Sequence, residues 1–296
     1  MSDAGAGRSV RAGDGERSEA LVTVELACND TGSGEPLVIL HGLLGAKRNW
    51  ATVAKALAGQ RRVLWADLRN HGSSPWDDAH TYPDMAADVA RLVETRIGGP
   101  ATVLGHSMGG KVAMLLALTR PERVARLVVV DIAPTVSQRA PRDFLAAMRG
   151  VPLAACRTRA EADAALAQSV ADPAVRGFLM QNVANGPDGL SWGVNLDALE
   201  RHFESIRGFP TIPHGRAYSG PTLFIAGGRS DYIRPEHAAE IDRLFPRATT
   251  ETLPAAGHWV HADAPAEFVA IVERFLATTA AYTGRHESDP LPHLPG

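Results

Sequence analysis

Gly105-His106-Ser107-Met108-Gly109 is the stretch that decides the fold of this chain. It follows the apolar residues 100–104 and precedes the apolar residues 110–118, so it predicts a strand, a sharp turn and a helix. The two glycines allow the strand and the helix to approach closely around a strained serine. A hydroxyl in this turn lies at a helix N-terminus, which favours developing negative charge. The pattern therefore predicts a nucleophile elbow of the G-x-S-x-G kind.

Bulk composition is that of a protein with a large core. The chain has 296 residues, of which 45% are hydrophobic and 21% charged, enough for one large α/β domain or two small ones. A net charge of -3 gives no reason to expect nucleic acid or an anionic membrane as a partner. We expect a small-molecule substrate and a monomer or small homo-oligomer.

The two cysteines and the ends of the chain bear on location. Cys28 and Cys156 lie far apart and match no metal spacing, so we expect reduced thiols in a cytoplasmic protein, with one disulfide as the alternative. No apolar stretch is long enough to span a membrane. Residues 1–20 lack the apolar region of a secretory signal and are predicted to be a flexible leader, and residues 283–296 a disordered tail.

Strand and helix patterns alternate along most of the chain. This alternation predicts a mostly parallel sheet with helices on both faces. Alternating apolar residues at 21–27 predict an opening edge strand. The other predicted strands are residues 36–40, 62–67, 100–104, 124–131, 220–227 and 249–253, and the predicted helices are 50–57 (with Asn49 as cap), 85–96, 110–118 and 266–278.

One long segment breaks the alternation. Residues 134–219 have apolar residues at helical spacing and contain no convincing strand. About 85 residues are too many for one crossover, so we predict a helical cap inserted into a core made of residues 21–133 and 220–282. Ordinary crossover helices are the alternative.

A serine nucleophile needs a base, because its hydroxyl is a poor nucleophile at neutral pH. His258 is the candidate, since it follows the last predicted strand and the chain order serine, acid, histidine is the one such folds use. His261 is a rival. His258, His261 and Asp263 together also resemble a metal cluster, but a serine elbow needs no metal, and we predict neither metal nor cofactor.

Two aspartates compete for the role of the acid that orients the imidazole. Asp231 follows the penultimate strand, in the usual place for this residue. Asp131 ends the strand after the elbow, a position that also supplies the acid in related folds. The sequence leaves the choice open.

Acyl transfer also requires donors for an oxyanion. We expect the backbone N–H of Met108, directly after the nucleophile, and that of Leu43, in the loop after an early strand. The expected substrate pocket is lined by Leu44, His106, Met148, Phe178, Trp192 and Trp259.

Five motifs, in this order, resemble one family. The chain is similar to the α/β-hydrolases of the YbfF type, a branch with bacterial acyl esterases and a mitochondrial abhydrolase-domain protein. The likeness covers residues 37–276 and is carried by residues 41–45, 67–74, 105–111, 131–134 and 257–261. It implies the α/β-hydrolase fold and serine hydrolysis of small acyl esters, or thioesters of the acyl-CoA kind. The branch favours Asp131 as the acid, whereas the wider superfamily supports Asp231. It gives Asp67 and His71 structural roles.

The sequence thus predicts a carboxylic ester hydrolase with an acyl-enzyme on Ser107. Two alternatives use the same fold. One is a carbon–carbon bond hydrolase or a cofactor-free haloperoxidase or perhydrolase, and the other is a binding module without catalysis. The complete set of Ser107, His258 and an aspartate argues against the binding module.

Overall fold

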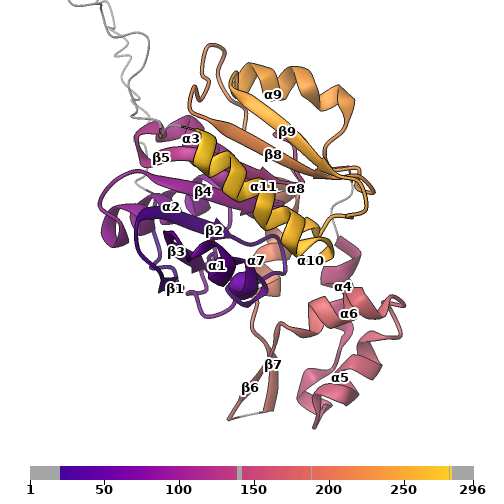
Figure 1. Cartoon of the computed structure of the whole chain (residues 1–296). Coiled ribbons are helices and arrows are strands. Elements are labelled where there is room, and N and C mark those ends of the chain that lie inside the picture. Colours follow the sequence, from indigo (N-terminus) through magenta and orange to yellow (C-terminus); the bar gives the residue numbers. More distant parts are fainter. Residues whose placement is uncertain (1–20, 139–141, 188, 280, 282–296) are drawn as a thin grey trace, which may run out of the picture.

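A seven-stranded sheet forms the centre of the computed structural model, which describes residues 21–138, 142–187, 189–279 and 281 (Figure 1). The strand order is β1-β3-β2-β4-β5-β8-β9, and only β1 runs antiparallel to its neighbour. The predicted mostly parallel sheet is therefore confirmed. The strands are β1 Cys28–Thr31, β2 Glu35–Leu40, β3 Arg61–Ala66, β4 Ala101–His106, β5 Val124–Val130, β8 Thr222–Gly227 and β9 Ala248–Leu253.

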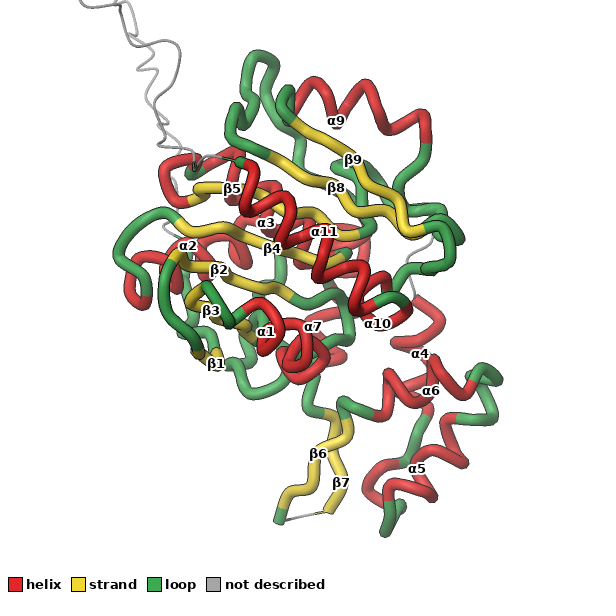
Figure 2. The backbone as a smooth tube through the Cα atoms, in the orientation of Figure 1, coloured by secondary structure: helices red, strands yellow, loops and turns green. Residues whose placement is uncertain are grey.

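Helices cover both faces of the sheet (Figure 2). Successive strand residues point to opposite faces, so a central strand supplies apolar side chains to two separate cores. In β2, Leu37 and Ile39 pack in the core with α1 (Ala51–Leu57) and α11 (Pro265–Thr278). Their neighbours Val38 and Leu40 pack in the other core, with helices α2 (Tyr82–Arg96), α3 (Met108–Thr119) and α9 (Ala238–Leu244).

Capping explains where α2 begins, whereas the cap expected for α1 is absent. The Thr81 and Asp84 side chains each accept a hydrogen bond from the other's backbone N–H, so α2 starts three residues before the predicted helix. Asn49, expected to cap α1, instead accepts from the N–H of Ala46 at 2.6 Å. It lies inside a short 3₁₀ turn, Lys47–Trp50, that leads into α1. Other short elements are the 3₁₀ turns Pro121–Arg123, Leu153–Ala155 and Pro235–His237, and α10 (Val260–Asp263).

Between β5 and β8 the chain leaves the sheet over residues 134–219, a segment called the excursion below. Figure 1 shows α4, α5, α6 and the β6–β7 hairpin as a lobe beside the sheet-and-helix core. The hairpin corrects the expectation of an all-helical segment. Its strands have four residues each and include Asn, Ser and Gly, so they lack the apolar alternation that marks a strand. The elements are α4 Arg142–Gly150, α5 Arg159–Leu166, α6 Pro173–Met180, β6 Val183–Gly186, β7 Gly189–Trp192, α7 Leu196–Arg201 and α8 Phe203–Arg207.

The predicted opening strand is wrong, because residues 21–27 form no strand and β1 begins at Cys28. Side chains hold this segment instead, with Val24 N–H donating to Asp88 and Ala27 N–H to the Ser74 hydroxyl. Cys28 and Cys156 are both free thiols. The predicted leader and tail lie outside the described residues. Within the described part of the chain, none of the helices combines the length and the apolar character needed to cross a membrane.

Gly105 allows a contact between β4 and α3 that a side chain would prevent. A Cβ at Gly105 would lie 2.1 Å from the carbonyl oxygen of Gly109, whereas nothing lies within 4 Å of a Cβ at Gly150, the last residue of α4. We expect Gly105→Ala to lower the free energy of unfolding by about 2–3 kcal/mol, measured by urea denaturation. Gly150→Ala should leave it unchanged or raise it by about 0.5–1 kcal/mol. Equal stability of both variants would contradict this account of the turn.

Candidate active site

Ser107 lies in the turn between β4 and α3 with φ 51° and ψ −118°, a conformation that L-residues rarely adopt. Neighbouring strands hold it there. The Ser107 N–H donates to the carbonyl of Val130 in β5, and the end of β2 packs so closely that a Cβ at Gly109 would lie 2.5 Å from the His41 carbonyl. The strand, sharp turn and helix predicted around Ser107 are thus what the fold builds.

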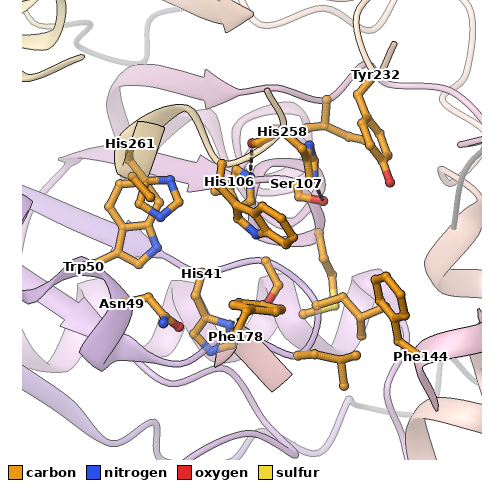
Figure 3. Close-up of a pocket in the computed structure, with 18 of the residues that line it drawn as sticks. His41, Asn49, Trp50, His106, Ser107, Phe144, Phe178, Tyr232, His258 and His261 are labelled. Carbon is orange, nitrogen blue, oxygen red and sulfur yellow. Dashed lines mark hydrogen bonds between the residues drawn. The ribbon is translucent and has the colours of Figure 1, made fainter. Parts of the chain in front are cut away.

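His258 reaches Ser107 from a loop 151 residues further along the chain. Its Nε2 atom is 3.1 Å from Ser107 Oγ (Figure 3). Two neighbours hold the backbone and the ring of His258. The Nε2–H group of His106 donates to the His258 carbonyl at 2.9 Å, and the ring of Tyr232 stacks on the His258 ring with centroids 4.0 Å apart. The rival His261 stacks on Trp50 instead, at 3.9 Å.

The carboxylate next to His258 belongs to Asp131. Asp131 Oδ2 is 2.7 Å from His258 Nδ1, and its side chain is completely buried. The end of β8 and the loop after it support this carboxylate, because the Gly227 N–H and the Ser230 hydroxyl both donate to it. Asp231, the other candidate, is exposed one residue further along the same loop. The structure therefore brings Ser107, His258 and Asp131 into one hydrogen-bonded row.

The two expected oxyanion donors flank the serine. Gly42 packs closely against the turn at Ser107, since a Cβ there would be 3.2 Å from Ser107 Cβ, and the following Leu43 lines the same cavity as Ser107. Among the described residues, neither Leu43 N–H nor Met108 N–H has a hydrogen-bond acceptor in the protein. Both donors are thus available to a bound oxygen.

A cavity of about 750 Å³ opens over Ser107. Of the residues expected in its wall, Leu44, His106, Phe178 and Trp259 line it. Aromatic side chains that the sequence did not indicate also line it: Tyr82, together with Trp50, Phe144 and Tyr232, which Figure 3 labels. Such a wall of apolar surface around a few polar groups is typical of small-molecule sites.

Met148 and Trp192 do not line this cavity, contrary to expectation. Met148 is completely buried in the core, and the Trp192 indole N–H donates to its carbonyl at 3.0 Å. They join α4 to the hairpin. Helical spacing identified an apolar face in this segment but did not indicate whether that face meets the core or the cavity.

Burial keeps the other site histidines neutral. It lowers the pKa of His106 well below its ordinary value, and it lowers that of His261 to about 3, with His258 adding to both shifts. Among the described residues there is no group of three or more His, Cys, Asp or Glu side chains that could hold a metal ion. Asp263 instead accepts from the Gly257 N–H at 2.7 Å and so shapes the loop that carries His258.

Lys111 joins the elbow helix to the long excursion. Its Nζ atom donates to the Ser137 hydroxyl, where the chain enters the excursion, and to the carbonyls of Arg207 and Gly208, where it returns. Burial, with a smaller contribution from the Arg207 charge, lowers the pKa of Lys111 to about 7. The excursion is therefore anchored one helical turn from Ser107.

Some of these residues carried no signal in the sequence. Tyr232 and Ser230 lie beside Asp231 in the loop that was considered only for its aspartate. Asn182, buried after α6, donates to the Leu44 carbonyl and was not singled out at all. Their functions depend on contacts between distant parts of the chain, which a single sequence does not display.

Comparison with known proteins identifies the family of the chain. The model of the alpha/beta hydrolase fold family matches residues 35–265. The chain is 44% identical over 249 residues to the mouse sn-1-specific diacylglycerol lipase ABHD11, covering 81% of this chain and 80% of the relative. It is 34% identical over 245 residues to esterase YbfF of Escherichia coli, covering 82% and 94%.

A solved structure agrees in fold and in class. A marine microorganism esterase superposes with a TM-score of 0.83 at 34% identity, covering 86% of this chain and 100% of that one. The resemblance to YbfF-type proteins is thereby confirmed. The chain belongs to the α/β-hydrolase family and is a carboxylic ester hydrolase.

Proposed function

We propose that this protein is a serine esterase that cleaves small carboxylic esters through an acyl-enzyme on Ser107. The observation that carries the proposal is the continuous row of polar atoms from Asp131 Oδ2 through His258 to Ser107 Oγ, with separations of 2.7 and 3.1 Å. This row supports a triad in which Ser107 is the nucleophile, His258 the base and Asp131 the acid.

The direction of the hydrogen bonds supports these roles. A carboxylate only accepts, so His258 carries its proton on Nδ1 and presents a bare Nε2 to the serine. As Ser107 Oγ attacks the acyl carbon, Nε2 takes the hydroxyl proton, and Asp131 stabilises the imidazolium that forms. The carbonyl oxygen becomes an oxyanion, which the N–H groups of Leu43 and Met108 stabilise.

Collapse of this tetrahedral intermediate completes the first half of the reaction. The bond from the acyl carbon to the leaving oxygen breaks, and the alcohol takes the proton from His258 Nε2. Water then attacks the acyl-enzyme while Nε2 removes one of its protons. The second intermediate collapses to release the carboxylic acid, and the Ser107 hydroxyl is restored.

The segment of residues 134–219 is proposed to act as the cap over this site. Phe144 from α4 and Phe178 from α6 both line the cavity, which supports a role in binding the acyl chain. Relatives named esterase and diacylglycerol lipase support acyl esters as the substrate class. The same attack cleaves a thioester, so acyl-CoA is the natural second substrate to assay.

Replacing the nucleophile tests the acyl-enzyme directly. Ser107→Ala removes the attacking oxygen, and kcat for p-nitrophenyl butyrate should fall by at least about 10⁴-fold. Wild-type protein should gain the mass of one phosphonyl group from a fluorophosphonate probe, and the variant should gain none. Activity within tenfold of wild type would refute Ser107 as the nucleophile.

The two aspartates form a matched pair. Asp131→Asn leaves the side-chain volume unchanged but removes the negative charge that accepts from the His258 Nδ1–H. We therefore expect kcat to fall by roughly 10³- to 10⁴-fold. Asp231→Asn should keep kcat within about twofold. The measurement is kcat with p-nitrophenyl butyrate for both purified variants, and the reverse order would assign the acid to Asp231.

The cap assignment predicts a change in chain-length preference. Phe144→Ala and Phe178→Ala each enlarge the cavity and leave more room for a long acyl chain. The ratio of kcat/KM for p-nitrophenyl octanoate to kcat/KM for p-nitrophenyl butyrate should therefore rise roughly tenfold. Trp192→Phe alters the same lobe away from the cavity and should leave the ratio unchanged. A ratio that moves in none of the three variants would count against acyl binding by this segment.

A further inference from the structure

The turn that carries the oxyanion donor Leu43 contains a strained residue. Leu44 has φ 58°, in the left-handed region that non-glycine residues seldom occupy, and its side chain is buried. The turn closes through a hydrogen bond from Gly45 N–H to the Gly42 carbonyl at 3.0 Å. Such a conformation persists only when neighbouring groups hold it.

Two side chains hold the peptide groups on either side of Leu44. The Leu44 N–H donates to His71 Nε2 at 3.3 Å, and the Leu44 carbonyl accepts from Asn182 Nδ2 at 2.7 Å. His71 comes from the core, in the loop after β3, where its own Nδ1–H donates to the Arg69 carbonyl. Asn182 comes from the excursion, two residues after α6 ends.

Asn182 is itself firmly held. Its side-chain amide nitrogen also donates to the Leu179 carbonyl at 3.2 Å, and its backbone carbonyl accepts from the Gly193 N–H at 2.6 Å. Both acceptors of the side chain are carbonyl oxygens, so only the NH₂ end of the amide fits this orientation. The residue is 3% exposed, which leaves water little access to the Leu44 carbonyl.

We propose that Asn182 is a positioning residue that sets the direction of the Leu43 N–H toward the oxyanion. The inference rests on the proposed serine mechanism and adds a contribution from the excursion to its oxyanion site. One peptide group separates the peptide that carries the Leu43 N–H from the peptide that carries the Leu44 carbonyl, and His71 holds that intervening group through the Leu44 N–H. Because the turn is also closed from Gly45 to Gly42, fixing the Leu44 carbonyl limits the rotation of the donor at its other end. Phe178 and Gln181, just before Asn182, line the cavity, so one short stretch contacts both the substrate space and the donor turn.

Asn182→Ala is the first test. The turn of residues 42–45 then loses one of the two side-chain hydrogen bonds that fix Leu44. Because oxyanion stabilisation depends on the direction of the donor, kcat should fall roughly 10- to 100-fold while KM stays within about twofold. Asn182→Asp keeps the volume but offers no donor to the Leu44 carbonyl when ionised, and it should lose at least as much. This isosteric variant separates the loss of the hydrogen bond from the effect of a cavity.

Asn195→Ala is the matched control. Asn195 also joins the excursion to a core loop, through its side-chain NH₂ to Asn70 Oδ1 at 3.0 Å, but it does not contact the turn at Leu44. It should keep kcat within about twofold although thermal unfolding shifts to a lower temperature. An equal loss of kcat in Asn195→Ala and Asn182→Ala would mean general loosening of the excursion and would overturn the inference.

Inhibition by an alkyl trifluoromethyl ketone distinguishes positioning from mere stability. The adduct of this ketone with a serine carries an oxyanion, so its Ki should rise in Asn182→Ala by the same factor by which kcat/KM falls. An unchanged Ki, or a wild-type kcat in both Asn182 variants, overturns the inference. If Ser107→Ala is inactive in the same assay, failure of the inference about Asn182 leaves the proposed function intact. An active Ser107→Ala would remove the proposed function and the inference together.

Discussion

The contact between Gly105 and the backbone of Gly109 is the constraint on which the site depends. It lets α3 begin directly after β4, with Ser107 in its strained conformation at the turn between them. The same close packing brings the end of β2 against the elbow, where its loop offers an N–H group. The positions of the proposed nucleophile and oxyanion donors thus depend on a backbone contact that no side chain larger than hydrogen permits.

Strain is distributed along one edge of the sheet. In the described part of the chain, the non-glycine residues with positive φ are Leu44, Asn70, Ser107 and Asp131. They follow β2, β3, β4 and β5, which are neighbours in the sheet, and all lie at the carboxyl ends of parallel strands. Residues in such conformations cost about 1–3 kcal/mol each and need support from their surroundings. For Leu44, Ser107 and Asp131 the hydrogen bonds of the site supply that support, so stability and geometry depend on the same contacts there.

Sequence predicted the local parts of this arrangement and missed those that depend on side-chain direction. The elbow around Ser107 was predictable because the glycine spacing encodes a backbone requirement. Asp131 and Asp231 remained undecided since each follows a strand at the same sheet edge, and only the fold shows which carboxylate turns toward His258. The β6–β7 hairpin escaped prediction because its strands are short and polar. Met148 was misplaced because an apolar helical face fits a core as well as a cavity.

The junction at Lys111 has a consequence for how this architecture diversifies. The Ser137 N–H donates to the Arg207 carbonyl at 2.8 Å, so the two crossings of the excursion meet at a single point. A different segment inserted at that point would need only two ends that lie close together. The entropy of closing a loop grows only with the logarithm of its length, so inserts of different size impose similar demands on the sheet. Exchange of whole modules there offers a route to new selectivity with Ser107, His258 and Asp131 left in place.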